Sequence, residues 1–379
     1  MPEVSVIMSV YNGAKYLRES VDSILAQTFH DFEFIIVDDA STDETPQILA
    51  SYSDERIRVL RNEHNLRQAT SRNRALAAAF GRYIAVQDAD DVSLQHRLET
   101  QITYLNNHPE VGLLGSTTIF MDWDGKELGI FPNPTSDLEA KWAMLDHNAF
   151  GHTSVMFRRH FYELLGGYPE NDQYCHSEDY VFCLKIAQNS KVENLPTPLV
   201  KWRAHAESTS HQNLERQRGQ VASVARRNLC WVMGWEEMDP QLWAAWRKFW
   251  YTPGVDPVAF EREEVELLAE LLLNVTNRFY SAYRLCGPEV RRHCRRVHYL
   301  WGRHALGLSY KPGSGSSLAA RRALLLLGMK LLATALAPHR GLKTRSGDTD
   351  TPPAELGGEA DTPVATTQHT PRIGGSSSA

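Results

Sequence analysis

The sequence predicts an α/β protein with a mainly parallel sheet and helices on both faces, followed by a helical C-terminal region. Across the first two hundred residues, short apolar runs alternate with amphipathic segments. Strand–helix alternation of this kind is typical of a parallel sheet covered on both sides. From about Leu214 to Leu306 the pattern is helical and rich in Trp, Arg and Leu. We therefore expect the helical region to follow the sheet.

Each expected strand is a short apolar run, and each expected helix carries apolar residues on one face. In the first helix, Leu17, Val21 and Ile24 share a face. Asp124 and Gly125 signal a hairpin turn. The predicted strands are Val4–Val10, Phe32–Val37, Ile57–Leu60, Tyr83–Val86 and Val111–Ile119, with a late edge strand at Leu199–Arg203. The predicted helices are Ala14–Gln27, one that begins at Ser41–Glu44, Gln68–Phe80, Leu94–Asn106 and Glu178–Ala187.

Composition divides the chain into four segments. Residues 1–210 hold the alternating pattern, and residues 211–310 hold the helical region. Residues 311–342 begin with a Pro-, Gly- and Ser-rich linker and continue into an amphipathic to apolar helix, Leu318–Ala337. Residues 343–379 are rich in Thr, Pro, Gly, Ser and Asp, so we expect a disordered tail.

Charge is unevenly distributed along the chain. The net charge of −6 gives no indication of a nucleic-acid partner, yet residues 290–345 contain twelve Lys or Arg and no Asp or Glu. A basic block beside an apolar run favours contact with anionic lipid. The Leu318–Ala337 helix would place Arg321, Arg322 and Lys330 near headgroup phosphates, without spanning the bilayer because Lys330 is central. The alternative is a helix docked on the protein body, with a solvated basic face.

Cysteine usage and the N-terminus indicate the compartment. The five cysteines are an odd number without a CxxC pair, which predicts neither a zinc site nor a disulfide framework. This composition fits a reducing compartment. The N-terminus runs into an apolar strand without the features of a signal peptide. We expect a cytoplasmic protein, peripheral at the inner face of the cytoplasmic membrane if its basic region binds lipid.

Acidic clusters follow two of the predicted strands directly. Asp38 and Asp39 end one strand, and Asp88, Asp90 and Asp91 follow another. In open parallel sheets, ligands bind at the carboxyl ends of the strands. The clustered charge is balanced if a divalent cation and a diphosphate bind there, and carboxylate oxygens suit Mg²⁺ or Mn²⁺. The alternative for any single Asp is a turn or a helix cap.

The first strand–helix turn lacks the motifs of two common nucleotide sites. It reads Ser9-Val10-Tyr11-Asn12-Gly13-Ala14, which contains neither GxGxxG nor GxxxxGK[ST]. A dinucleotide fold and a phosphate-binding P-loop therefore lose their main support. Tyr11 is instead placed to lie against a base, although an aromatic residue near a strand end is often part of the core.

Seven segments resemble, in order, the signature blocks of family-2 glycosyltransferases, which have the GT-A fold. The resemblance extends over about residues 3–210. It implies an inverting enzyme, typically of bacterial surface polysaccharide or lipopolysaccharide synthesis. The segments are Val6–Asn12, Ile36–Asp43, Ser71–Leu76, Gln87–Asp91, Gly166–Pro169, Ser177–Tyr180 and Lys201–His205.

The resemblance implies a role for each matching position on the donor side. Asp38 would accept the N3–H of uracil, and Ser9 and Tyr11 would line the base pocket. Arg72 lies where the family often has a basic residue that faces the donor. Asp88 would lie near the ribose or sugar.

For the metal, the resemblance implies Mn²⁺ or Mg²⁺ held by the D-x-D pair. Asp90 would be the more direct ligand and Asp88 the second acid. His205 matches a late histidine that completes the metal or diphosphate site. The position before the pair, commonly Leu in the family, is Gln87.

Asp179 is the expected general base, and Glu178 is the second choice. Inverting transfer needs one carboxylate that removes a proton from the acceptor hydroxyl as its oxygen attacks the anomeric carbon. Without the resemblance, both acids would simply favour the positive N-terminus of a helix that Ser177 caps.

The resulting hypothesis is a glycosyltransferase that uses a nucleotide-sugar, most commonly a UDP-sugar in this family. Its acceptor would be a glycan or lipid-linked glycan. Two alternatives stay open from the sequence. A sugar nucleotidyltransferase would need a Gly-rich basic loop after the first strand, which Tyr11–Lys15 does not provide. An inactive nucleotide-sugar-binding module would have kept the fold without activity.

Overall fold

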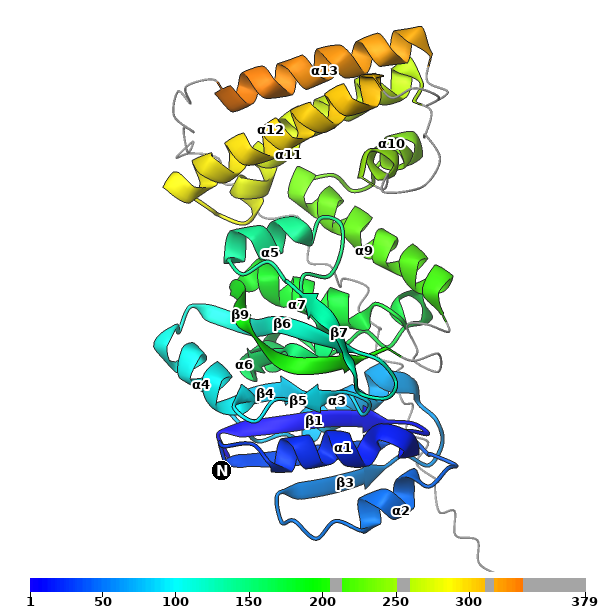
Figure 1. The fold of residues 1–379 in the computed structure, drawn as a ribbon, viewed down its shortest axis with the longest axis vertical. Helices are drawn as coiled ribbons and strands as arrows, with labels where there is room; N and C mark the ends of the chain where they lie inside the picture. The colour runs from blue at the N-terminus through cyan, green and yellow to red at the C-terminus, as the bar shows by residue number, and fades with distance from the viewer. Residues whose placement is uncertain (205–212, 251–259, 311–316, 337–379) are drawn as a thin grey trace, which may run out of the picture.

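The computed structural model describes residues 1–204, 213–250, 260–310 and 317–336. The chain forms an elongated molecule with the sheet towards one end and the last helices at the other (Figure 1). His205, most of the expected linker and the expected disordered tail lie outside the described residues.

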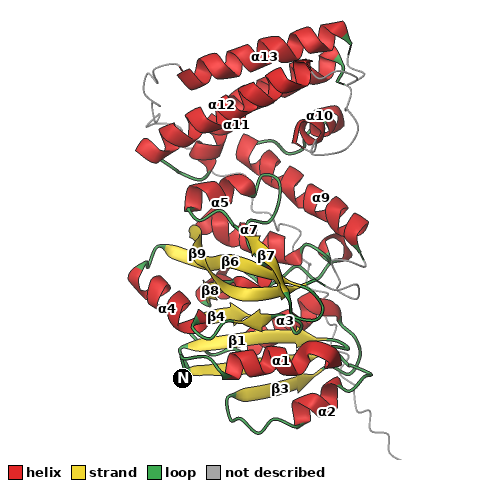
Figure 2. Cartoon of the chain, in the orientation of Figure 1, coloured by secondary structure: helices red, strands yellow, loops and turns green. Residues whose placement is uncertain are grey.

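Within the described residues the strands form one nine-stranded sheet, in the order β3-β2-β1-β4-β8-β6-β9-β5, with β7 paired to β6 (Figure 2). Strands β1 to β4 pair in parallel, which confirms the predicted parallel core. The strands are β1 (Val4–Val10), β2 (Phe32–Asp38), β3 (Ile57–Arg61), β4 (Tyr83–Val86), β5 (Val92–Ser93), β6 (Val111–Met121), β7 (Glu127–Phe131), β8 (Met156–Arg158) and β9 (Lys191–Arg203).

Helices follow most strands and also form the C-terminal region. They are α1 (Ala14–Leu25), α2 (Thr45–Ala50), α3 (Arg67–Ala78), α4 (Arg97–Asn107), α5 (Asp137–Ala143), α6 (His160–Leu165), α7 (Glu178–Asn189), α9 (Leu214–Met233), α10 (Pro240–Trp250), α11 (Arg262–Ala282), α12 (Pro288–Tyr310) and α13 (Leu318–Leu336), with short 3₁₀ turns η1 (His152–Ser154) and η2 (Asp172–Tyr174).

The pleat of β1 explains why helices cover both faces of the sheet. Successive side chains of a strand point to opposite faces. Val6 and Met8 belong to the core cluster of Leu17 on α1, whereas Ile7 belongs to that of Leu76 on α3. The run is therefore apolar throughout, as expected of a strand buried on both faces.

The predicted edge strand Leu199–Arg203 needs correction. These residues end a longer strand, β9, that lies inside the sheet between β6 and the two-residue β5. β9 pairs in parallel with β6 from Lys191 to Arg203, with register shifts near Pro198. Pro196 and Pro198 disrupt a regular ladder, which hid the first part of the strand from sequence inspection.

The C-terminal helices share a core with α5. Trp142 of α5 packs edge-on against Phe279 of α11 and lies near Trp301 of α12. In the Trp-rich segment between residues 231 and 246, Trp231, Trp235 and Trp243 are partly buried against the same core. Trp246 is 2% exposed.

The apolar side of α13 faces the protein. Ala320, Leu324, Leu327 and Leu331 are buried in the core shared with α11 and α12. One apolar side of this helix is therefore docked on the protein, as in the docked alternative, whereas Leu318, Leu326 and Met329 are exposed. Among the described helices, none combines the length and apolarity that crossing a membrane requires.

Candidate active site

A cavity of about 440 Å³ lies at the carboxyl ends of β1 and β4. Strand ends, the loop after β4 and the first turn of α7 contribute to its wall. The predicted residues Ser9, Tyr11, Arg72, Asp88, Asp90, Glu178 and Asp179 all line it. The fold therefore brings together residues that are up to 170 positions apart in the sequence (179 minus 9).

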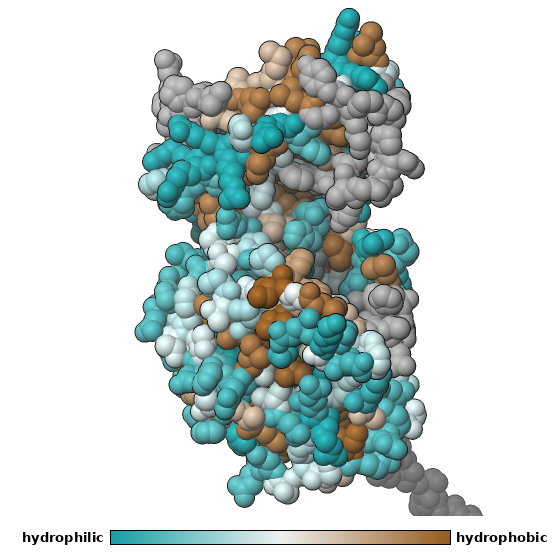
Figure 3. Space-filling model, viewed as in Figure 1, coloured by the Kyte–Doolittle hydropathy of each residue, from teal (hydrophilic) through white to brown (hydrophobic). Residues whose placement is uncertain are grey.

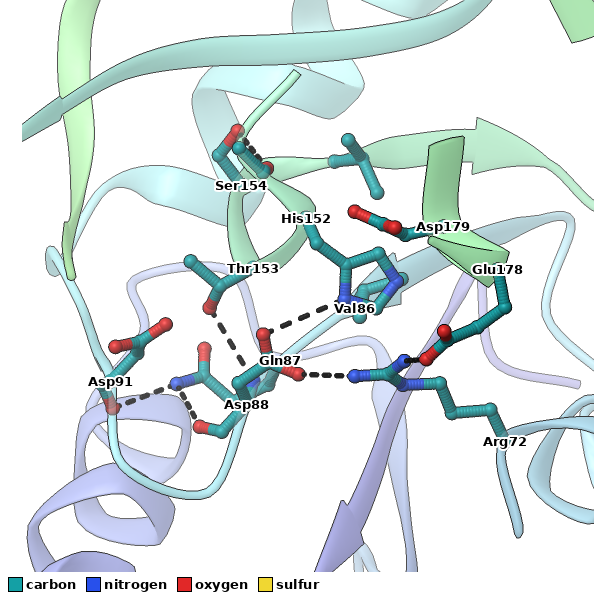
Figure 4. A network of polar contacts seen from close by, with 12 residues as sticks. Arg72, Val86, Gln87, Asp88, Asp91, His152, Thr153, Ser154, Glu178 and Asp179 are labelled. Carbon is teal, nitrogen blue, oxygen red and sulfur yellow. Dashed lines mark hydrogen bonds and ion pairs between the residues drawn. The ribbon is translucent and has the colours of Figure 1, made fainter. Parts of the chain in front are cut away.

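Asp88 is held between two basic side chains (Figure 4). Its Oδ1 accepts a hydrogen bond from Arg72 Nη2 at 3.0 Å, and its Oδ2 lies 3.5 Å from His152 Nδ1. Burial opposes ionisation of this carboxyl, but the charges of His152 and Arg72 outweigh that effect and hold its pKa well below the usual range. Asp88 is thus a fixed carboxylate at the cavity wall.

Gln87 supports the acidic loop from beneath. Its side-chain amide donates to the backbone oxygens of Asp88 and Asp91 at 3.1 and 2.9 Å. Its Oε1 accepts hydrogen bonds from Ser93 Oγ and Arg97 Nη1. A leucine, the common residue here in the resembling family, could make none of these bonds. Gln87 is therefore part of a buried polar network that a leucine could not join.

Asp90 and Asp91 have different environments. Asp90 lines the cavity and is half-buried. Asp91 is buried and accepts a hydrogen bond from the backbone N–H of Arg203 at 2.9 Å. Burial, followed by the charges of Asp90 and Asp88, raises the pKa of Asp91 well above its usual value.

The two acids at the start of α7 differ in a way that bears on catalysis. Glu178 is buried and paired with Arg72 Nη1 at 2.8 Å. Burial raises the pKa of Glu178 despite the Arg72 charge. Asp179 is half-exposed and accepts a hydrogen bond from Asn148 Nδ2 at 3.0 Å. Of the two, Asp179 is the more accessible carboxylate.

A second cavity of about 370 Å³ adjoins the first, and Ser9 and Tyr11 line both. Asp38, the expected partner of the base, lines neither. Its carboxylate accepts a hydrogen bond from Ser41 N at 2.9 Å and lies 3.4 Å from Arg61 Nε. Asp39 lines the second cavity instead. The structure therefore brings Asp39, not Asp38, to the pocket of Tyr11.

Asp39 is well fixed in this position. Among the described residues, Asn62 Nδ2 and Leu66 N donate hydrogen bonds to its Oδ1, at 2.6 and 2.8 Å. Oδ2 remains to accept a donor from a ligand.

The expected metal site is incomplete in the described residues. They contain no cluster of three or more His, Cys, Asp or Glu side chains arranged to hold a metal. His205 lies outside them. Asp88 and Asp90 nonetheless line the same cavity.

Sequence reasoning missed several residues of the site. Asn148 and His152 lie in a segment without a recognised motif, and the cavity wall also contains Phe120, Phe131 and Trp202. The sequence around Asn148 and His152 contains no pattern that would have singled them out. The three aromatic residues come from three different strands, so only the sheet register brings them together.

Comparison with known proteins gives consistent matches. The family model described as Glycosyl transferase family 2 matches residues 5–165. An uncharacterized glycosyltransferase of Methanocaldococcus jannaschii is 37% identical over 208 residues, which are 53% of this chain and 71% of that protein. An Escherichia coli relative, the UDP-Glc:alpha-D-GlcNAc-diphosphoundecaprenol beta-1,3-glucosyltransferase WfaP, is 31% identical over 229 residues, 59% of this chain and 87% of its own.

Among solved structures, residues 1–349 of TarS from S. aureus, in complex with UDP-GlcNAc, superpose with a TM-score of 0.51. The match covers 88% of this chain and 91% of that one at 19% identity. At this level of identity the likeness concerns the fold, including the helical region after the sheet.

Proposed function

Because the chain belongs to glycosyltransferase family 2 and has the GT-A fold, we propose that it transfers a sugar, with inversion, from a UDP-sugar to a hydroxyl group of a glycan or lipid-linked glycan. Membership in this family makes the chain a glycosyltransferase and removes the nucleotidyltransferase alternative. The donor, the metal and the inverting step are the proposal.

One observation carries the catalytic assignment: of the two acids at the start of α7, Asp179 is the more exposed. Both line the cavity, but Glu178 is buried and its carboxylate is paired with Arg72. Asp179 is half-buried and is oriented by Asn148. A general base must reach the proton that it removes, and Asp179 meets that requirement.

The transfer is then a single displacement. The acceptor hydroxyl gives its proton to an Asp179 oxygen while its own oxygen forms a bond to the anomeric carbon. The bond between that carbon and the diphosphate oxygen breaks, and its electron pair leaves with UDP. Attack from the face opposite the leaving group inverts the anomeric centre.

The second cavity supports recognition of the nucleotide. Tyr11, which is 50% exposed, gives an aromatic face for a base. Asp39 Oδ2 would accept the N3–H of uracil in place of Asp38. The name of WfaP gives UDP-Glc as its donor, and TarS was solved with UDP-GlcNAc, which is why we propose UDP for this chain.

The acidic loop suits Mg²⁺ or Mn²⁺. Mg²⁺ at nucleotide sites is held by one or two carboxylates together with phosphate oxygens and water. Asp90 and Asp88 supply such a pair at the cavity wall. Asp90 would be the direct ligand. When bound, the cation would neutralise the charge that develops on the departing diphosphate.

The acceptor and the membrane contact are proposed from weaker but specific features. WfaP is named for a diphosphoundecaprenol acceptor, so a lipid-linked acceptor of surface polysaccharide synthesis is proposed here. One apolar side of α13 is docked on the protein, and we propose that contact with anionic lipid uses the exposed arginines of α12. We call its exposed residues Arg292, Arg296, Tyr299 and Arg303 the arginine stripe; they recur at helical spacing on one side.

The direct test is a panel of UDP-, GDP-, dTDP- and CMP-sugars, with and without Mn²⁺. The expected result is that UDP-sugars raise the melting temperature and are hydrolysed or transferred in a metal-dependent way, because a ligand that binds only the folded state stabilises it. A preference for another nucleotide, or no turnover with any donor, would contradict the proposal.

A further inference from the structure

Three aromatic side chains form one part of the main cavity wall. Phe120 lies edge-on to Trp202, with ring centroids 4.9 Å apart, and edge-on to Phe131 at 5.6 Å. The register explains this grouping. Phe120 is opposite Trp202 on β9, and Thr118 is opposite Phe131 on β7. Residues two apart on a strand share a face, so the three rings, which we call the aromatic wall, face the same cavity.

The aromatic wall is open to solvent at the β6–β7 hairpin. Phe131 is 55% exposed, and Leu128 and Ile130, on the other face of β7, are exposed as well. Figure 3 shows hydrophobic side chains gathered over the β6–β7 hairpin in the middle of the molecule. Exposed apolar clusters of this kind on a soluble protein mark binding sites more often than isolated surface residues do.

Sheet order separates this wall from the donor residues. The nucleotide residues come from β1 and β2, the acidic loop follows β4, and the aromatic wall is on β6, β7 and β9, beyond β8. A donor that extends from the Tyr11 pocket to Asp88 and Asp90 therefore has its sugar end towards the aromatic wall. Asp179 lines the same cavity.

The chemistry of the wall fits a sugar ring. A pyranose has an apolar C–H face, which packs on aromatic rings, and a rim of hydroxyl groups. Two amide side chains, Asn133 and Asn148, line the cavity together with the rings and offer hydrogen-bonding groups for hydroxyls. Each amide already donates one hydrogen bond, Asn133 to the backbone oxygen of Ser116 and Asn148 to Asp179, and each has a second N–H that a sugar hydroxyl could accept.

We propose that the aromatic wall of Phe120, Phe131 and Trp202 is the acceptor subsite and binds a pyranose ring of the acceptor glycan. This assignment rests on the proposed function, since it presumes a donor at the acidic loop. The wall holds the ring whose hydroxyl Asp179 deprotonates. The residues of this wall therefore control the affinity for the acceptor and leave the affinity for UDP unchanged.

The test is saturation-transfer NMR with the full chain, UDP and Mg²⁺, using the methyl glycosides of glucose, N-acetylglucosamine, galactose and mannose as probes. We expect saturation of ring C–H protons for at least one probe with the wild type. Phe131→Ala and Trp202→Leu should reduce that signal at least fivefold, whereas Trp202→Phe, which keeps an aromatic face, should restore most of it. UDP affinity, measured by calorimetry in parallel, should change less than twofold.

Trp123→Ala is the matched control, because Trp123 lies on the same hairpin and is exposed but does not line the cavity. It should leave the sugar signal unchanged. The subsite is overturned if UDP binds but no probe gives a signal, if Phe131→Ala and Trp202→Leu keep it, or if Trp123→Ala loses it equally. Failure of the wild type to bind UDP would instead overturn the proposed function, and the subsite with it.

Discussion

The side-chain amide of Asn148 donates a hydrogen bond to the carboxylate of Asp179 over 3.0 Å. Asn148 is itself held, because its Oδ1 accepts a hydrogen bond from the backbone N–H of Phe150 at 3.2 Å. The pair fixes which Asp179 oxygen is turned towards the amide and which remains for the acceptor. Asn148 is thus a positioning residue for the proposed base.

Asp179→Asn tests the base directly. The substitution keeps the shape of the side chain but removes the proton acceptor, so transfer should fall by roughly 10²-fold or more. UDP affinity should stay within twofold of the wild type, because the side chain contacts no nucleotide in the proposed mechanism. Rates from a coupled UDP-release assay and affinities from calorimetry check both statements. If rate and affinity fell by the same small factor, Asp179 would be a structural residue.

Asp39→Asn tests recognition of uracil, with Asp38→Asn as the matched neighbour. UDP binding should weaken by about 1–3 kcal/mol in Asp39→Asn, the scale of a lost hydrogen bond to a charged group. Asp38→Asn should leave UDP affinity unchanged, since the Asp38 carboxylate is engaged with Ser41 and Arg61. The decisive readout is the preference for UDP over CDP, which a general loss of structure would not alter selectively. An unchanged preference in Asp39→Asn would refute this assignment.

The sequence could not determine which of the two adjacent acids, Asp38 or Asp39, lines the cavity of Tyr11. Two adjacent acids at a strand end point in different directions, and the motif alone does not say which one faces the ligand. In the fold, Arg61 of β3 pairs with Asp38 and draws it away. That contact depends on the pairing of β2 with β3, which is a tertiary feature.

The parallel core, by contrast, could be predicted because each of its strands is a self-contained apolar run followed by an amphipathic helix. The antiparallel strand β8 has only three residues, too few to show any periodicity. Its position between β4 and β6 places the η1 turn, and with it His152, beside Asp88. The residues that sequence inspection missed are those whose neighbours come from distant strands.

Asp90→Ala tests the metal. Transfer should stop in EDTA, return with Mn²⁺ or Mg²⁺, and be mostly lost in Asp90→Ala even with excess metal. The fold should survive, because Asp90 is half-buried at a cavity wall and is not part of the core. Asp124→Ala, an acid in the exposed hairpin turn, serves as the control and should keep full activity. Full turnover by metal-stripped protein in EDTA would falsify the metal requirement.

Gly302→Ala tests the packing of α12 on α13. A Cβ at Gly302 would lie 2.7 Å from Leu332 and 3.0 Å from the backbone oxygen of Gly328, so the two helices would have to separate. Overpacking of this kind costs about 1–3 kcal/mol. Gly219→Ala on α9 is the control, because a Cβ there meets nothing within 4 Å and should stabilise the helix by about 0.5–1 kcal/mol. Urea unfolding followed by circular dichroism should shift the midpoint in opposite directions for the two variants.

Substitution of the arginine stripe of α12 tests whether the protein contacts a membrane surface. Arg292, Arg296 and Arg303 are exposed, and Arg303 stacks over the ring of Tyr299 at 5.9 Å. Each basic residue near an anionic surface contributes about 1 kcal/mol. Replacing all three by Gln should therefore weaken binding to vesicles that contain phosphatidylglycerol by roughly tenfold or more. Vesicles of phosphatidylcholine alone should bind neither protein.

A matched control removes three exposed arginines elsewhere, so that total charge changes equally. If the stripe acts locally, this control should float with anionic vesicles as the wild type does. Binding of the wild type should also weaken as the salt concentration rises, because surface charges are screened within about 10 Å at 0.1 M ionic strength. Equal loss in both triple variants would mean that net charge alone causes the association. Absence of flotation for the wild type would mean that the stripe is a solvated helix face. The control positions are Arg218, Arg262 and Arg284.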